Sequence, residues 1–303
     1  MKFGKFETSE DLKRLNEISW KLPLSRIEWK VDLKRTEDVK ILVRTGGTMW
    51  TVKSWRGKVY PQKDPMRTWA KHYGRQFSTI EFNATHYRIY TPEKMNSWAS
   101  EMPEDFVFCP KFPSIISHYR RFNNCEGPTD DFISGLVALG KKLGPAFLQL
   151  SPHFSPKQRD KLMAFLNNWP RNLKMAIEFR HANWFKGGRE AELVWELMSK
   201  LGIGAVISDT AGRRDALHMR FTAPFVIVRF GGYDGHSSDE KRLRSWAEKI
   251  NGFKQDGIPI ESLDFLVHTT NSVHTPESCV LFAKIMKEVC DIDVKVPVLD
   301  YLP

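Results

Sequence analysis

The sequence predicts an α/β fold in the form of a TIM-like (β/α)8 parallel barrel with an N-terminal extension. Three observations lead to this class. Short apolar segments recur along the chain, helical patterns separate them, and the alternation spans about 250 residues, the usual length of such a barrel. A doubly wound open sheet is the alternative. It is disfavoured because no G-x-G-x-x-G or G-x-x-x-x-G-K-[ST] motif follows any of the apolar segments.

The predicted extension comprises residues 1–40, which precede this alternation. Ser9 can cap a helix that ends before Pro23. The charged stretch 24–40 shows no clear period. We therefore divide the chain into an N-terminal extension, 1–40, and a barrel domain, 41–303.

The barrel strands are expected where apolar residues run without a helical period. These eight segments are 41–45, 79–83, 106–111, 145–150, 174–180, 203–208, 225–230 and 263–268. Helical patterns between and after them occupy 66–77, 92–102, 129–143, 156–168, 189–201, 239–254 and 276–289. Pro92 and Pro156 stand at the first helical position, where a missing N–H costs no hydrogen bond. Only 209–224 is too short for a full-length crossover helix.

Composition and charge restrict the class of protein. With 41% hydrophobic residues, the 303-residue chain can bury a large core. It has no apolar run long enough for a membrane span and no secretory signal, so no membrane partner and a cytoplasmic location are expected. The four cysteines lack C-x-x-C spacing, which disfavours a metal cluster or a disulfide scaffold. A net charge of +10 favours an anionic small molecule or nucleic acid as partner.

The segment 174–185 organises the expected site. Its strand places Glu178 and Arg180 on one face, because side chains alternate across a strand, and His181 follows at once. In a parallel barrel the carboxyl ends of the strands gather at one mouth, where catalysis takes place. The other strands also end in polar or charged residues: Glu81 and Asn83, Lys111, Gln149, Asp209, Arg229 and His268.

This arrangement predicts an enzyme, with hydrolysis as the reaction class, acting on a phosphorylated or nucleotide-like substrate. Glu178 is the expected general acid or base, and Asp209 or Glu81 its counterpart. The side chains expected to bind the anion and stabilise developing charge are Lys111, which we count as catalytic, Arg180 and Arg229. Residues expected to orient or enclose the substrate are Asn83, Gln149, Trp50, Tyr87, His181 and His268.

Three alternatives stay open. The charged residues could form a structural ion network, because buried charges must be paired. The chain could be a nucleic-acid-binding barrel without catalysis, which its net charge favours. It could also be a metal-assisted phosphodiester hydrolase, with carboxylates and His268 as ligands. We predict no cofactor and assign no metal ligand, because the basic side chains at the same mouth would repel a cation; a divalent metal stays an alternative.

Several segments, taken in order, resemble the YecE-like proteins, a family named as a domain of unknown function (number seventy-two). They are 46–50, 55–57, 60–61, 80–88, 108–111, 116–118, 148–150 with Pro152 and Phe154, 178–181, 184–185, 208–209 and 228–229. The resemblance covers roughly residues 41–290 and implies a TIM-barrel-like fold. It implies no activity, because the family's name records none.

Overall fold

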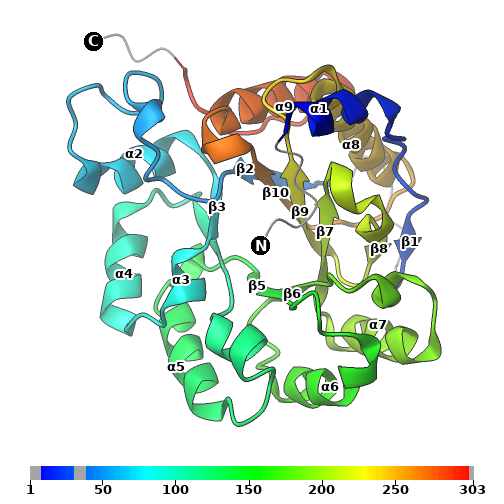
Figure 1. Cartoon of the computed structure of the whole chain (residues 1–303). Coiled ribbons are helices and arrows are strands. Elements are labelled where there is room, and N and C mark those ends of the chain that lie inside the picture. The colour runs from blue at the N-terminus through cyan, green and yellow to red at the C-terminus, as the bar shows by residue number, and fades with distance from the viewer. Residues whose placement is uncertain (1–7, 31–38, 300–303) are drawn as a thin grey trace.

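The computed structural model describes residues 8–30 and 39–299 of the chain. Figure 1 shows strands gathered at the centre with helices around them. All eight predicted strands are confirmed to within two residues at each end. They are β2 (Leu42–Gly46), β3 (Thr79–Phe82), β4 (Val107–Pro110), β5 (Ala146–Gln149), β6 (Met175–Glu178), β7 (Gly204–Asp209), β9 (Phe225–Gly231) and β10 (Ser262–His268).

Every strand pairing in the described part of the chain is parallel. Six strands form one sheet in the order β2-β10-β9-β7-β6-β5, and β3 pairs with β4 in a separate sheet. Single contacts join these sheets: the Glu81 amide donates to the Gly47 carbonyl at 3.0 Å, and Lys111 forms an isolated bridge with Phe147. The ladders thus establish an α/β fold with parallel strands, not one continuous barrel sheet.

The helices cover the outside of the strands (Figure 1). Seven were predicted: α2 (Trp69–Gln76), α4 (Pro92–Glu101), α5 (Glu126–Val137), α6 (Arg159–Asn168), α7 (Arg189–Leu201), α8 (Ser237–Gln255) and α9 (Thr275–Cys290). The expected end of α5 at residue 143 is wrong, since the chain leaves the helix before Gly140, whose φ is +56°. The one-turn helix α3 (Ala84–Tyr87) was not predicted. No helix of the described residues is long and apolar enough to cross a membrane.

Both faces of the strands are buried. Alternate positions of β4 to β10 contribute to a small apolar cluster: Cys109, Phe147, Ala176, Val206, Ala223, Phe225, Ile227 and Leu266. The opposite faces pack against the helices in two larger clusters, one including α2, α8 and α9 and the other α5 to α7. Two-sided burial explains why the strands read as apolar runs without alternation.

The described part of the extension packs onto the barrel domain. Helix α1 (Ser9–Arg14) leads to Leu15, which is buried against Ala211 and Tyr233 in the loops after β7 and β9. Further on, β1 (Arg26–Ile27) pairs with β8 (Arg220–Phe221), a two-residue ladder too short to leave a sequence signal. The proposed division into domains stays a prediction.

Candidate functional site

Side chains from seven strands meet at the carboxyl ends of the strands. This strand-end cluster consists of Glu81, Lys111, Gln149, Glu178, Arg180, Ser208, Arg229 and His268. All except Ser208 were predicted site residues. All but Glu81 follow a member of the small apolar cluster by two or four residues on the same strand. They therefore point to the same side of the strands as that cluster, because every second residue of a strand shares a face.

Arg229 on β9 joins the two carboxylates of the cluster. Its Nε and Nη2 donate to the two oxygens of Glu81 at 2.8 and 3.1 Å. Its Nη1 donates to both oxygens of Glu178, at 3.0 and 3.1 Å. Burial opposes the charge of this guanidinium, but the two carboxylates outweigh it and raise the pKa of Arg229. The three groups form a buried, fully ionised triad.

Glu178 on β6 accepts hydrogen bonds from every side. Besides Arg229, its donors are Gln149 Nε2 at 2.7 Å, Ser208 Oγ at 2.9 Å and Arg180 Nε at 3.1 Å. Burial would raise the pKa of Glu178, but the charges of Arg180 and Arg229 outweigh it and hold that pKa at about 2. Such a carboxylate does not accept a proton near neutral pH. The geometry therefore does not support the expected acid or base role of Glu178.

Glu81 on β3 is in the same state. His268 Nε2 donates to its Oε2 at 2.8 Å, beside the two bonds from Arg229. The pKa of Glu81 lies well below its usual range, because Arg229 and His268 together overcome the effect of burial. Burial in turn lowers the pKa of His268, which favours the neutral ring. These contacts make Glu81 an anchor for Arg229 and do not support its expected role as counterpart in proton transfer.

Lys111, directly after β4, differs from its neighbours. It is only 8% exposed, yet its ammonium makes no ion pair or hydrogen bond with any residue in the described part of the chain. Its Nζ lies 5.5 Å from the centroid of the Phe147 ring. Burial lowers the pKa of Lys111 to about 8, despite the nearby charge of Glu81. Within the strand-end cluster, the charge of Lys111 is therefore available to a ligand. Its ammonium can also lose or gain a proton near neutral pH.

Two histidines from the loops after β3 and β4, His86 and His118, lie beside Lys111. His86 Nδ1 donates to the Phe112 carbonyl at 2.8 Å, and its ring centroid lies 5.3 Å from that of His118. Burial and the charge of Lys111 lower the pKa of His86, and burial and His86 lower that of His118 to about 4. Both rings are therefore neutral near neutral pH.

Asp209 does not belong to the strand-end cluster, so that prediction is wrong. Its carboxylate pairs with Arg242 at 2.9 Å and with Arg214, and accepts from Trp246 Nε1 at 2.9 Å. Since Arg242 and Trp246 belong to α8, Asp209 points to the helix side of β7. Its neighbour Ser208 takes the inward position, because adjacent strand residues face opposite ways.

Four other predicted residues have local roles. Trp50 packs against Phe82 and Trp98, with centroid distances of 5.4 and 6.3 Å, so it does not wall the cluster. Asn83 Nδ2 donates to the Thr48 carbonyl at 3.4 Å. His181 Nδ1 accepts from the Asn183 amide and caps the turn Ala182–Phe185. Tyr87 is 83% exposed at the end of α3.

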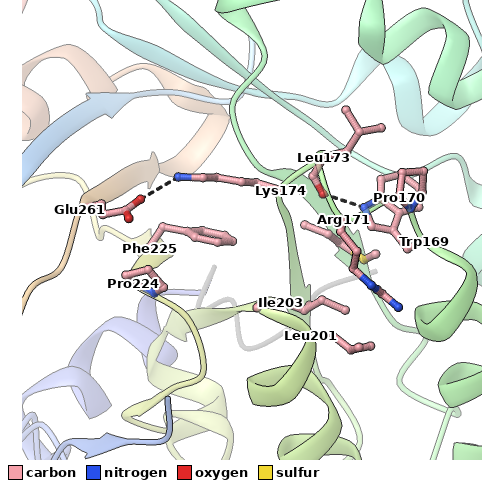
Figure 2. Close-up of a pocket in the computed structure, with 12 residues that line it drawn as sticks. Trp169, Pro170, Arg171, Leu173, Lys174, Leu201, Ile203, Pro224, Phe225 and Glu261 are labelled. Carbon is pink, nitrogen blue, oxygen red and sulfur yellow. Dashed lines mark hydrogen bonds and ion pairs between the residues drawn. The ribbon is translucent and has the colours of Figure 1, made fainter. Parts of the chain in front are cut away.

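The opposite ends of the strands hold a pocket of about 230 Å³, drawn in Figure 2. Its walls are mostly apolar, and Lys174 pairs there with Glu261 at 2.9 Å while both stay half-exposed. Arg171 bonds the carbonyls at the end of α6. No buried ionisable group faces this pocket among the residues drawn.

Backbone strain collects at the same end as the strand-end cluster. Among described non-glycine residues with positive φ, three follow β4, one follows β9 and two follow β10: Arg121, Phe122, Asn124, Asp234, Asn271 and Ser272. Such conformations cost free energy and gather where a fold positions functional groups. No group of three or more His, Cys, Asp or Glu in the described residues could hold a metal ion.

Comparisons with known proteins agree with this architecture. The model of the family described as "Protein of unknown function DUF72" matches residues 44–297. The UPF0759 protein YecE of Escherichia coli K12 is 28% identical over 225 residues, which cover 68% of this chain and 81% of that protein. Crystal structures of DUF72 family proteins from Enterococcus faecalis and Thermotoga maritima superpose with TM-scores of 0.63 and 0.62 at 18% and 20% identity. They cover 84% and 82% of this chain, and 99% and 98% of their own.

Proposed function

This chain belongs to the DUF72 family of proteins of unknown function, and we propose that it is an enzyme acting on an anionic, phosphorylated or nucleotide-like substrate. The substrate's anionic group would bind at Lys111, beside Arg180, at the carboxyl ends of the strands. Hydrolysis is the reaction class we infer. The expected assignment changes: Lys111 replaces Glu178 as the group that moves a proton, and Glu81 and Asp209 are no longer its counterparts.

The observation that carries the proposal is the unpaired ammonium of Lys111. The strand-end cluster holds three cationic side chains, Lys111, Arg180 and Arg229, against two carboxylates, both of which are bound to arginine. Lys111 adds a further, largely buried cation that pairs with neither carboxylate, which a structural ion network does not need, because burying a charge costs free energy. A bound anion would supply the missing partner and raise the pKa of Lys111 again.

We further infer that the eight strands close into a TIM-like barrel. The contacts that join β2 to β3 and β4 to β5 support this arrangement, as does the apolar cluster on the common inner face. A closed ring would fix the cluster residues on rigid strands, which limits the reorganisation needed when charge develops in a transition state.

Phosphate-ester hydrolysis fits these groups. The Lys111 ammonium would give a proton to the leaving oxygen as the P–O bond breaks. Water would add its oxygen to phosphorus and release a proton, which restores the ammonium. Arg180 would contact the phosphoryl oxygens and stabilise their charge. The triad of Glu81, Glu178 and Arg229 would hold Arg180 in place and undergo no protonation change itself.

The proposal is tested by anion binding and turnover together. Calorimetric titration with inorganic phosphate, and hydrolysis of a panel of phosphate monoesters and nucleotides, are compared for the wild type and Lys111→Met. We expect wild-type binding and turnover, and at least about a hundredfold loss of turnover in the variant. Lys174→Met is the matched control, since it removes a lysine at the opposite strand ends (Figure 2). Equal phosphate binding and turnover in the wild type and Lys111→Met would contradict the proposal.

A further inference from the structure

The loops after β3 and β4 carry the same tripeptide. His-Tyr-Arg occurs at residues 86–88 and again at 118–120. The two histidine rings lie 5.3 Å apart and almost perpendicular, which brings the copies together. His86 bonds the carbonyl of Phe112, the residue after Lys111, so the pair stands beside the proposed anion site.

The tyrosines of these tripeptides differ from the other aromatic side chains in their exposure to solvent. Tyr87 is 83% and Tyr119 77% exposed. Every other Phe, Trp and Tyr among residues 8–30 and 39–299 is buried or half-buried. An exposed ring forgoes the stabilisation that its burial in the core would contribute. These two exposed rings, on the loops after β3 and β4, leave aromatic surface on which a flat partner could stack.

The two loops are rigidly held. Thr85 Oγ1 donates to the Lys111 carbonyl at 2.7 Å, next to the bond from His86 to Phe112, so α3 is fastened to the end of β4. The second loop is a π-helix, Ile115–Tyr119, followed by residues of positive φ. A π-helix and a strained loop are features that folds retain mainly at functional sites.

Basic side chains complete the surface. Arg88, Arg120 and Arg121 are exposed next to the two tyrosines. We propose that the two His-Tyr-Arg loops form a binding platform for a single-stranded polynucleotide. Bases stack on Tyr87 and Tyr119, while the arginines contact backbone phosphates and direct one phosphate to Lys111. This inference rests on the proposed function, and it specifies the substrate as a polymer with bases.

The platform is tested by fluorescence anisotropy with labelled oligothymidylate and oligouridylate of about eight nucleotides, at low salt. We expect the full-length protein to bind at least one of them. The double variant Tyr87→Ala, Tyr119→Ala should bind at least about tenfold more weakly, because each base stack is lost. The matched double variant Tyr87→Phe, Tyr119→Phe keeps both rings and should bind like the wild type. Inorganic polyphosphate, which has the charges but no bases, should bind the wild type and the alanine variant equally.

Other results would overturn the platform. They are failure of the wild type to bind either oligonucleotide, equal binding by the alanine variant, or equal binding of a duplex of the same length. A parallel titration with inorganic phosphate distinguishes failure of the platform from failure of the proposed function. If phosphate binds and the Lys111→Met variant loses that binding, but neither oligonucleotide binds, only the platform is contradicted. Absence of both removes the proposed function as well.

Discussion

Lys111 lies where its charge is disfavoured, since burial lowers the pKa of the ammonium to about 8. An unfolded lysine titrates near ~10.4, so the unfolded state binds more protons between these values. The charge therefore destabilises the fold below the folded pKa, and stability rises as pH increases through that window. We predict that Lys111→Met raises the free energy of unfolding at neutral pH by about 1–3 kcal/mol, measured by urea denaturation. The half-exposed Lys174→Met should change it by less than about 0.5 kcal/mol. A loss of stability in Lys111→Met would mean that the ammonium is a paired structural group.

Glu178 has the opposite dependence on pH. Its folded pKa of about 2 lies below the unfolded value of ~4.3. Its contribution is therefore fully present above the unfolded pKa and is lost as pH falls through the folded one. We predict that Glu178→Gln costs about 3–5 kcal/mol at neutral pH, because Arg180 and Arg229 lose their shared carboxylate. The variant should also show a shallower loss of stability in acid. Unfolding curves over the acid range measure both, and an unchanged stability would remove Glu178 from its anchoring role.

At this scale the sequence predicted part of the site. The pairing of Glu178 with Arg180 follows from their positions two residues apart on one strand. The isolation of Lys111 does not, because it depends on Arg229 reaching both carboxylates across the mouth. Only the three-dimensional structure shows that Lys111 is the cation without a partner.

Among the elements, β7 is a strand for which the sequence pattern does not predict the direction of the side chains. Both faces of β7 are buried, so nothing in residues 204–209 says whether Ser208 or Asp209 faces inward. The charged residue was expected at the site. It lies instead against α8, where Arg242 and Trp246 satisfy it. Trp20 of the extension covers this second ion cluster, 4.6 Å from the Arg242 guanidinium.

The contacts of Asp209 with Arg242 and Trp246 join β7 to the helix α8, and we expect them to stabilise the fold without a role in binding. We predict that Asp209→Asn lowers the free energy of unfolding by about 3–5 kcal/mol, since Arg242 and Arg214 lose the carboxylate that they share. The same variant should bind inorganic phosphate with wild-type affinity at a temperature where it is folded. Thermal unfolding and calorimetric titration measure the two quantities. A variant that is stable but loses phosphate binding would return Asp209 to the site.

For the whole molecule, the order of strands and helices was predictable. Each element is an apolar or amphipathic segment long enough to show its period in the sequence. The eight strands and seven helices recur at their expected places. The attachment of residues 8–30 was not predictable. It depends on the two-residue β1–β8 pair and on Leu15 packing with Tyr233, contacts between segments about two hundred residues apart.

The most direct measurement is the NMR titration of the Lys111 side chain in the intact protein, with and without saturating inorganic phosphate. The free protein should titrate with a pKa of about 8 at this lysine. Phosphate should raise that pKa by at least about one unit, so its affinity falls as pH rises above the free value. A pKa at the ordinary lysine value in the free protein, or one that phosphate leaves unchanged, would contradict an anion site built around this ammonium.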